Sequence, residues 1–242
     1  MQIIDKRAAL LIPPVLRLGF RPFFLLGSVL ALMAVPLWLL ALQGDVSGWQ
    51  PVGGWLAWHR HELLFGFVGA IIAGFLLTAV QTWTGRPSIS GKPLALLALI
   101  WLAARMSWLL AAPMWLLVLL NLAFPLLVFA QMARLIWAVR QRNNYPIVVV
   151  LLLLALADAQ VLVSMALGEE GWQRQGVLAA LWLVAGLMGV IGGRVIPFFT
   201  QRGLGRATAV QPWVKLDWAI LLGSLLVAVL HALGLALLPS GW

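Results

Sequence analysis

The chain has 242 residues, of which 63% are hydrophobic and 10% charged, and its mean hydropathy is +1.02. Because soluble domains carry roughly 25% charged residues, this composition excludes a soluble globular protein and indicates an integral membrane protein. The absence of cysteine excludes disulfides, thiolate metal sites and iron–sulfur clusters held by this chain, and the net charge of +9 must be explained by where the basic residues lie.

Seven apolar runs follow one another along the chain, each near the length of about 20 residues that a membrane-spanning helix needs. They lie at 23–42, 62–80, 93–112, 114–138, 147–167, 177–197 and 215–238. Leu and Ala dominate them, and the alternating polarity of a membrane barrel does not occur. We therefore predict an all-α fold, a polytopic transmembrane helical bundle. The connecting segments are too short for a soluble domain, so residues 1–242 form a single transmembrane domain.

The basic residues lie mainly on one side of this predicted bundle. They occupy the N-terminal segment and the loops after the second, fourth and sixth spans, whereas the opposite loops hold Arg60 and Arg174. By the positive-inside rule, the N-terminus is inside and the C-terminus outside. The basic composition is therefore a signal of membrane orientation, and we expect no nucleic-acid partner.

Titratable side chains at membrane depth are costly, so they are the functional candidates. In this chain they are His59, His61, Glu62, Arg105, Asp158 and His231. Arg105 and Asp158 lie at similar depths in the third and fifth spans, by the rise of about 1.5 Å per residue. They could form a structural ion pair, or Arg105 could hold an anionic ligand such as a haem propionate.

The segment that opens the second span on the outer side contains two histidines. If the helix begins at Gly53 or Gly54, His59 and His61 point about 200° apart, so one helix face cannot present both to one metal. His59 and Glu62 do share a face and could be a metal ligand or a proton-relay pair. The plainer alternative is a pair of histidines hydrated at the membrane surface.

His231 lies in the outer half of the last span, as the other two histidines do in theirs. This convergence favours a cofactor, and we expect His61 and His231 to approach one another across the bundle. Neutral imidazole is a common haem ligand in helical membrane bundles and a good copper ligand. The alternative for His231 is a structural hydrogen bond to a neighbouring helix.

Four segments carry a family resemblance. They read RLGFRPFF at 17–24, WHRHELLFGF at 58–67, GFLLTAV at 74–80 running into WTGRP at 83–87, and GRVIPFFT at 193–200. In this order they resemble the NnrS family of bacterial inner-membrane proteins. The resemblance implies a multi-pass protein of the bacterial cytoplasmic membrane that contains haem, and in some members copper, and is associated with denitrification and tolerance of nitric oxide.

Carried over to this chain, the resemblance makes His59 and His61 the leading metal or haem ligands, with Glu62 as their proton partner and no catalytic residue otherwise assigned. His231 and Arg105 join them as candidate cofactor-binding residues, and Asp158 as a supporting one. Further candidate supporting residues fall on the other motifs: Arg17, Arg21, Trp83 and Arg194. Typical members of the family are longer, so this chain is a short relative, one half of a split protein completed by a partner membrane chain, or a degenerate copy. A homo-oligomer is the other assembly considered.

The leading hypothesis is therefore a haem-binding, NnrS-like protein that meets nitric oxide in the lipid bilayer. It leaves open a nitric oxide reductase-like oxidoreductase, a sensor and an electron carrier. Two other classes remain: a haem- or quinone-linked electron-transfer subunit of a larger membrane complex, with two axial histidines, and a cofactor-free transporter whose polar groups line a pathway.

Overall fold

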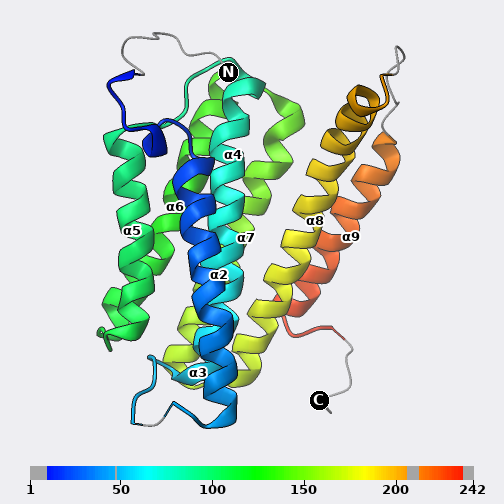
Figure 1. Cartoon of the computed structure of the whole chain (residues 1–242). Coiled ribbons are helices and arrows are strands. Elements are labelled where there is room, and N and C mark those ends of the chain that lie inside the picture. Colours follow the sequence, from blue (N-terminus) through cyan, green and yellow to red (C-terminus); the bar gives the residue numbers. More distant parts are fainter. Residues whose placement is uncertain (1–9, 47, 206–212, 237–242) are drawn as a thin grey trace.

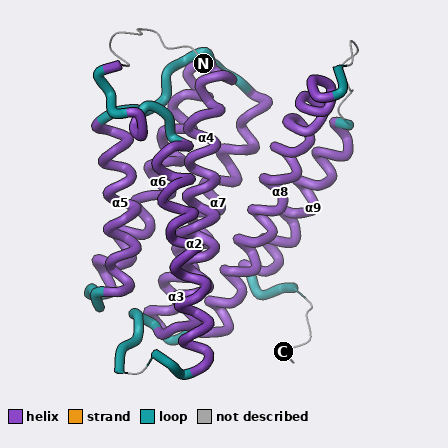
Figure 2. Tube along the Cα trace, viewed as in Figure 1, coloured by secondary structure: helices purple, strands orange, loops and turns teal. Residues whose placement is uncertain are grey.

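The computed structural model describes residues 10–46, 48–205 and 213–236 of the chain. Within these ranges every regular element is a helix, and no strand occurs (Figure 2). Seven of the helical stretches that the structure describes are long and apolar enough to cross a membrane. The prediction of an all-α bundle with seven spans is confirmed.

The seven stretches that could span a membrane run alternately up and down the bundle (Figure 1). In chain order they are α2 (Phe20–Gln43), the second span Gly54–Thr84 built from α3 (Gly54–His61), a π-helical segment (Glu62–Val68) and α4 (Gly69–Thr84), then α5 (Lys92–Leu109), α6 (Met114–Ala138), α7 (Tyr145–Leu167), α8 (Glu170–Gly203) and α9 (Val214–Ala232). Short 3₁₀ turns at Pro14–Leu16 and Arg142–Asn144 precede α2 and α7.

The bundle has two parts (Figure 1). Helices α2 and α4 to α7 surround a common core in which Phe23, Leu76, Met132 and Ile147 are almost completely buried. Helices α8 and α9 form a hairpin that packs along α7. Since large apolar side chains such as Leu32 and Met188 are exposed on the outer surface, that surface fits a lipid environment.

The boundaries differ from the predicted ones mainly at the polar ends. Helix α8 begins at Glu170 rather than near 177, because its first turn is polar and extends beyond the apolar run. Helix α9 ends at Ala232, earlier than the predicted 238, because the chain turns at Gly234 with φ of +70°. The second span begins at Gly54, after Gly53 in a left-handed conformation.

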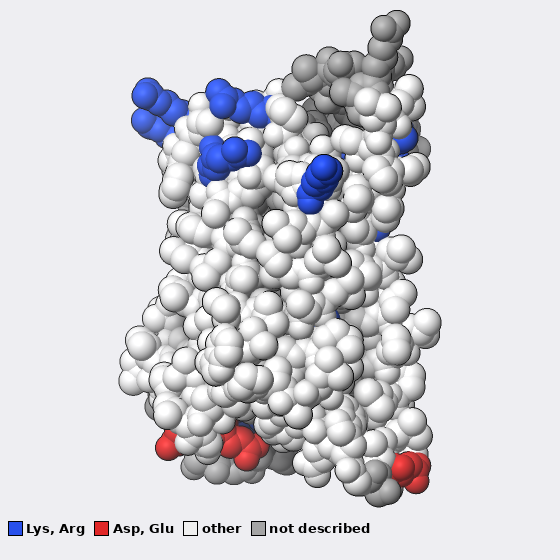
Figure 3. Space-filling view, turned by 90° about the vertical axis from the view of Figure 1, so that its left-hand side faces the viewer, with Lys and Arg blue, Asp and Glu red and all other residues white. Residues whose placement is uncertain are grey.

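The charged surface residues separate along the long axis. On the face drawn in Figure 3, Lys and Arg gather at the end that carries the N-terminus, and Asp and Glu lie at the opposite end. A broad band of uncharged side chains lies between them. This arrangement agrees with the charge bias of the loops, so the positive-inside rule still predicts that the N-terminal end is the inner one.

The second span contains an irregular helical segment at the point where its histidines lie. Directly after His61, residues Glu62–Val68 form a π-helix. Such wider turns are rare and occur frequently at functional sites. In this chain the π-helical segment supplies a charged side chain, Glu62, and two side chains that line a small cavity, Leu64 and Phe65.

Candidate functional site

A buried imidazole lies between two carboxylates near the start of the second span. The Nε2 atom of His61 lies 2.9 Å from Oδ1 of Asp158 on α7, and its Nδ1 atom lies 3.0 Å from Oε1 of Glu62. All three side chains are excluded from solvent, with exposed fractions of 1% or less. The two ring nitrogens of His61 are therefore both hydrogen-bonded.

Arg105 on α5 extends this cluster. Its Nε atom lies 2.6 Å from Oε2 of Glu62, so the two side chains form an ion pair. The Nε–H group is not aligned for a hydrogen bond to that oxygen. The guanidinium also lies over the ring of Trp101, 5.1 Å from its centroid. Trp101 in turn donates a hydrogen bond to the carbonyl of Gly66 in the π-helical segment, at 3.1 Å. Arg105 thus joins the second span to α5.

Asn121 on α6 completes the chain of contacts. Its side-chain oxygen accepts hydrogen bonds from Arg105, at 2.5 Å, and from the indole of Trp108, at 3.3 Å. Its amide donates to the carbonyl of Leu117. Pro125, four residues later, has no N–H. The backbone carbonyl of Asn121 therefore lacks its usual helical hydrogen bond and is free to accept another. Four spans therefore contribute to one polar network.

The donors and acceptors fix the charge that this network can carry. An ionised carboxylate can only accept hydrogen bonds, so a His61 bonded to two ionised carboxylates must donate from both nitrogens and be an imidazolium. With Arg105, the two positive charges then balance Glu62 and Asp158. The same network stays satisfied if the proton moves from His61 to either carboxylate. It therefore holds one proton at three alternative sites without leaving a buried group unbonded.

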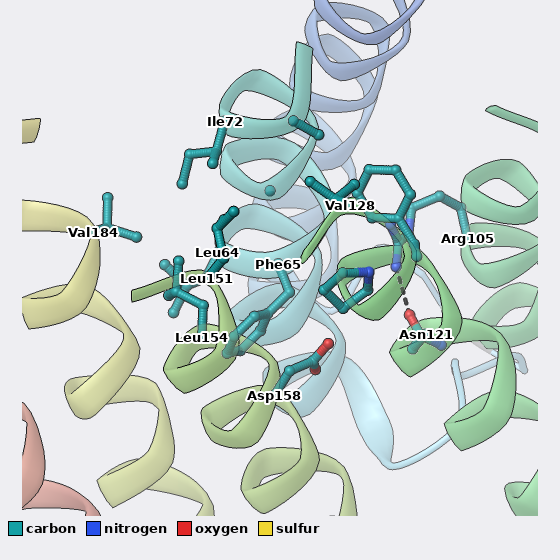
Figure 4. A pocket seen from close by; sticks show the side chains of 14 residues that line it. Leu64, Phe65, Ile72, Arg105, Asn121, Val128, Leu151, Leu154, Asp158 and Val184 are labelled. Carbon is teal, nitrogen blue, oxygen red and sulfur yellow. Dashed lines mark hydrogen bonds between the residues drawn. The ribbon is translucent and has the colours of Figure 1, made fainter. Parts of the chain in front are cut away.

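A small internal cavity borders this network (Figure 4). Its volume is about 50 Å³, and apolar side chains such as Phe65, Phe124 and Val128 form most of its wall. Arg105, Asn121 and Asp158 supply its polar side. Since one water needs roughly 10–15 Å³ of such space, the cavity can hold a few waters or a diatomic gas, and larger substrates do not fit.

His59 points to a different part of the bundle from His61, as the helix periodicity predicts. Its ring stacks on Trp38 of α2, with centroids 4.4 Å apart and planes inclined by 13°. Its Nδ1 atom is buried, and no described residue hydrogen-bonds to it. A buried nitrogen without a partner is costly, so His59 has a donor atom that a ligand could occupy.

His231 lies near the outer end of α9 and is 7% exposed. The ring of His61 is hydrogen-bonded to Glu62 and Asp158, and its aromatic neighbours are Phe65 and Trp108. Helix α9 packs chiefly on α8. The structure therefore does not bring His61 and His231 together as neighbours. Arg105 and Asp158 also join one network without pairing directly, since Arg105 bonds Glu62 and Asp158 bonds His61.

The histidines differ in how well they fit a metal or haem. His61 does not fit in this arrangement, because a metal ligand needs a free nitrogen lone pair and both its nitrogens are bonded to carboxylates. His59 fits by its unpartnered Nδ1 atom. Within the described residues, no group of three His, Asp or Glu side chains is arranged to hold a metal ion. A multidentate copper site would require His61 to release a carboxylate.

The motif residues outside this network serve two other places. Arg17 and Arg21 donate hydrogen bonds to backbone carbonyls of Ile12 and Pro14, at 2.9 and 2.7 Å, and so fix the segment that precedes α2. Trp83 and Arg194 line a cleft at the opposite end of the bundle from His61. These four motif residues therefore lie outside the buried network. Two of them hold the segment before α2, and two line a second cavity.

Asn121 and the two indoles at Trp101 and Trp108 belong to the network and are absent from the sequence candidates. The sequence candidates at membrane depth were titratable side chains, so these three residues were not among them. Asn121 carried a usable signal, since an amide side chain in the middle of an apolar span also needs a hydrogen-bonding partner. The tryptophans gave no such signal among the fourteen of the chain.

One comparison with known proteins identifies a family. The family model described as NnrS protein matches residues 14–242. No curated protein and no solved structure matches the chain. The chain therefore belongs to the NnrS family.

Proposed function

We propose that the protein binds haem and acts in nitric oxide metabolism or the nitrosative stress response, with nitric oxide entering the cavity beside Asp158. Family membership supports the biological context. The observation that carries the proposal is the cavity itself, which is small and mostly apolar and has a proton-holding network in its wall.

Nitric oxide suits this cavity in size and polarity. It is a small, uncharged diatomic molecule that dissolves in the bilayer, so it can reach an internal cavity between helices. The apolar wall made by side chains such as Phe65 and Phe124 accepts it without leaving polar groups unbonded. Arg105 and Asn121 offer polar atoms that can orient it or an anionic product derived from it.

The buried network supplies the cavity with a proton. Reduction of nitric oxide consumes protons and electrons. The electrons would come from an external donor by way of haem, and the proton-holding side chains are almost completely excluded from solvent. A proton on Nε2 of His61 can pass along the 2.9 Å contact to Asp158, whose side chain lines the cavity. Glu62, held by Arg105, stabilises the positive charge while it resides on the imidazole. In this proposal His61 holds a proton and is not a metal ligand.

His59 would hold haem, because its buried Nδ1 atom has no described hydrogen-bond partner. Haem, when bound, supplies an iron atom to which nitric oxide can coordinate. Trp38, stacked on the imidazole, fixes the plane of the ring and hence the direction of its lone pair. His231 is the second candidate ligand, since it is a buried histidine near the end of α9. Copper is a secondary proposal and would require His61 to give up one carboxylate contact.

The proposal places the protein in the bacterial inner membrane, in contact with lipid on most of its surface. The N-terminus would be on the cytoplasmic side. The proposal leaves room for a second copy or a partner membrane chain against the exposed apolar faces of α8 and α9.

An optical titration tests the proposal. The protein is purified from cells supplied with haem, and spectra are recorded oxidised and reduced, before and after addition of nitric oxide. We expect a haem spectrum that changes with nitric oxide and is lost in His59→Ala, while His231→Ala, a matched histidine variant on another helix, retains it. If only His231→Ala lost the haem spectrum, the haem ligand would be His231 on α9. A folded wild-type protein that takes up no haem would overturn the proposal.

A further inference from the structure

The largest of the three main cavities lies at the end of the bundle opposite to His61, between α7 and the α8–α9 hairpin. Its volume is about 450 Å³. Figure 1 shows that this is the end carrying the N-terminus, where α8 and α9 lean away from α4 and α7. The polar wall includes Gln141, Asn144 and Arg194, and the apolar rim includes Val190 and Leu221. We call this cavity the inner cleft.

One wall of the inner cleft is a connected hydrogen-bond network. Gln141 donates to the carbonyl of Trp83 and accepts from the amide of Asn144, both at 2.9 Å. Arg194 reaches across from α8 and donates to the side-chain oxygen of Asn144 and to the carbonyl of Asn143. Asn144 is 3% exposed, so the network is anchored in the bundle and holds Arg194 in place.

The facing wall carries a carboxylate to which no described residue donates a hydrogen bond. Asp217 on α9 lies against Gly193, where an added Cβ atom would meet the carboxyl carbon at 2.8 Å. The missing side chain at Gly193 thus lets the carboxylate approach α8 beside Arg194. Among the described residues none donates a hydrogen bond to Asp217, and Arg194 directs its own bonds to the asparagines. A donor and an acceptor therefore line the same cavity.

The remaining lining is suited to a flat, amphipathic molecule. The indole rings of Trp83 and Trp218 both line the cleft. Val190, Val214 and Leu221 add an apolar surface continuous with the membrane-spanning helices. The charges of Arg194 and Asp217 balance, so the site does not select for an anion. The lining is complementary to a ligand that has a hydrogen-bond acceptor, a hydrogen-bond donor, a planar ring and an apolar tail.

We propose that the inner cleft binds the head group of a membrane quinone. A quinone or quinol has oxygens on opposite edges of a planar ring, so one oxygen can accept from Arg194 while a quinol hydroxyl donates to Asp217. The ring lies between the indoles, and the isoprenoid tail leaves along the apolar rim. A tetrahedral phosphate head group uses neither the planar space nor the indole faces.

The test is binding of a short-chain ubiquinol analogue, kept reduced under anaerobic conditions, to the purified, delipidated protein, measured by equilibrium dialysis. We expect Arg194→Gln and Asp217→Asn each to raise the Kd by roughly tenfold or more, since each removes a hydrogen bond to a charged group. Arg202→Gln is the matched control, because Arg202 is an exposed α8 arginine against Phe198 and outside the cleft. If a charge variant fails to fold, Trp218→Ala removes one of the rings that line the cleft and should also raise the Kd.

Equal affinity of wild type, cleft variants and control would overturn the proposal. So would displacement of the analogue from the wild-type protein by a short-chain phosphatidylethanolamine at comparable concentration, because the cleft would then be a phospholipid site. The measurement requires neither haem nor nitric oxide, and its failure is therefore distinguishable from failure of the proposed function.

Discussion

The imidazole of His61 lies 2.9 Å from the carboxylate of Asp158, although 97 residues separate them in the sequence. This contact ties the second membrane span to the fifth. It also places a proton-carrying group next to a side chain that lines the central cavity. The consequences for stability and chemistry can be measured separately.

Removal of the Asp158 carboxylate should destabilise the protein strongly. Asp158→Ala leaves the His61 ring bonded to one carboxylate in a buried, low-dielectric site, and loss of one partner of a buried ion pair costs about 3–5 kcal/mol. Unfolding of the detergent-solubilised protein measures this loss. Glu170→Gln is the control, because Glu170 is exposed and its ion pair with Arg60 spans 3.5 Å. We expect that change to cost at most about 1 kcal/mol, and equal losses would contradict the assignment.

Glu62 and Arg105 should be energetically coupled. Each single change, Glu62→Gln or Arg105→Gln, leaves an uncompensated charge in the network, whereas the double change removes both charges of the 2.6 Å pair. We expect the double variant to be more stable than the sum of the single losses predicts, by about 0.5–3 kcal/mol. A double-mutant cycle in unfolding free energy provides the value. Additive losses would show that the pair does not interact.

Asn121→Leu should destabilise the bundle even though it replaces an amide by an apolar group. The change removes the acceptor for Arg105 and Trp108, and each buried donor left unbonded costs about 1–3 kcal/mol. Asn143→Ala is a matched control, since Asn143 is exposed and only its backbone carbonyl is bonded. A thermal shift equal to that of the control would mean that Asn121 does not satisfy these donors.

Gly186→Ala should loosen the α8–α9 hairpin. A Cβ atom at this position would lie 2.9 Å from Cβ of Ser224, which cannot move away without a shift of α9. We expect a loss of about 1–3 kcal/mol from overpacking. Gly223→Ala on α9 has no atom within 4 Å of the added Cβ and should be neutral or slightly stabilising. Measurement of both melting temperatures checks this prediction, and equal values for the two variants would contradict it.

The orientation follows from the charge bias and can be tested with fusions. Alkaline phosphatase, which is active only outside the cytoplasm, should be active when fused after residue 242, and a fluorescent protein should be bright when fused before residue 1. The physical reason is that basic loops are retained on the cytoplasmic side. The reverse pattern would invert the assignment of both cavities to the two membrane faces.

The sequence predicted the fold well because membrane insertion imposes a simple constraint on the chain. Each span must satisfy its backbone hydrogen bonds internally, so long apolar runs such as 114–138 are read directly as helices. The end of α9 was misplaced because hydropathy does not register the turn at Gly234. The π-helical segment after His61 was not predicted either, since its residues have an ordinary apolar composition.

The sequence predicted most residues of the candidate site, but it did not predict which of them contact one another. Depth arguments selected His61, Glu62, Arg105 and Asp158, which the structure places in one network. Depth alone does not give the rotation of a helix about its axis, and so the sequence could not show that Arg105 faces Glu62 while Asp158 faces His61. The same limitation explains the expected approach of His61 to His231.

The most direct test of the account is an infrared difference spectrum between the haem-loaded protein with nitric oxide bound and after its photodissociation. We expect carboxyl bands from a change in proton position, together with an N–O stretch, and we expect Asp158→Asn to remove the former and shift the latter. These changes would show that the network next to the cavity responds to the ligand. Identical spectra in wild type and Asp158→Asn would contradict the claim that the proton network of His61 and Asp158 responds to nitric oxide in the cavity beside it.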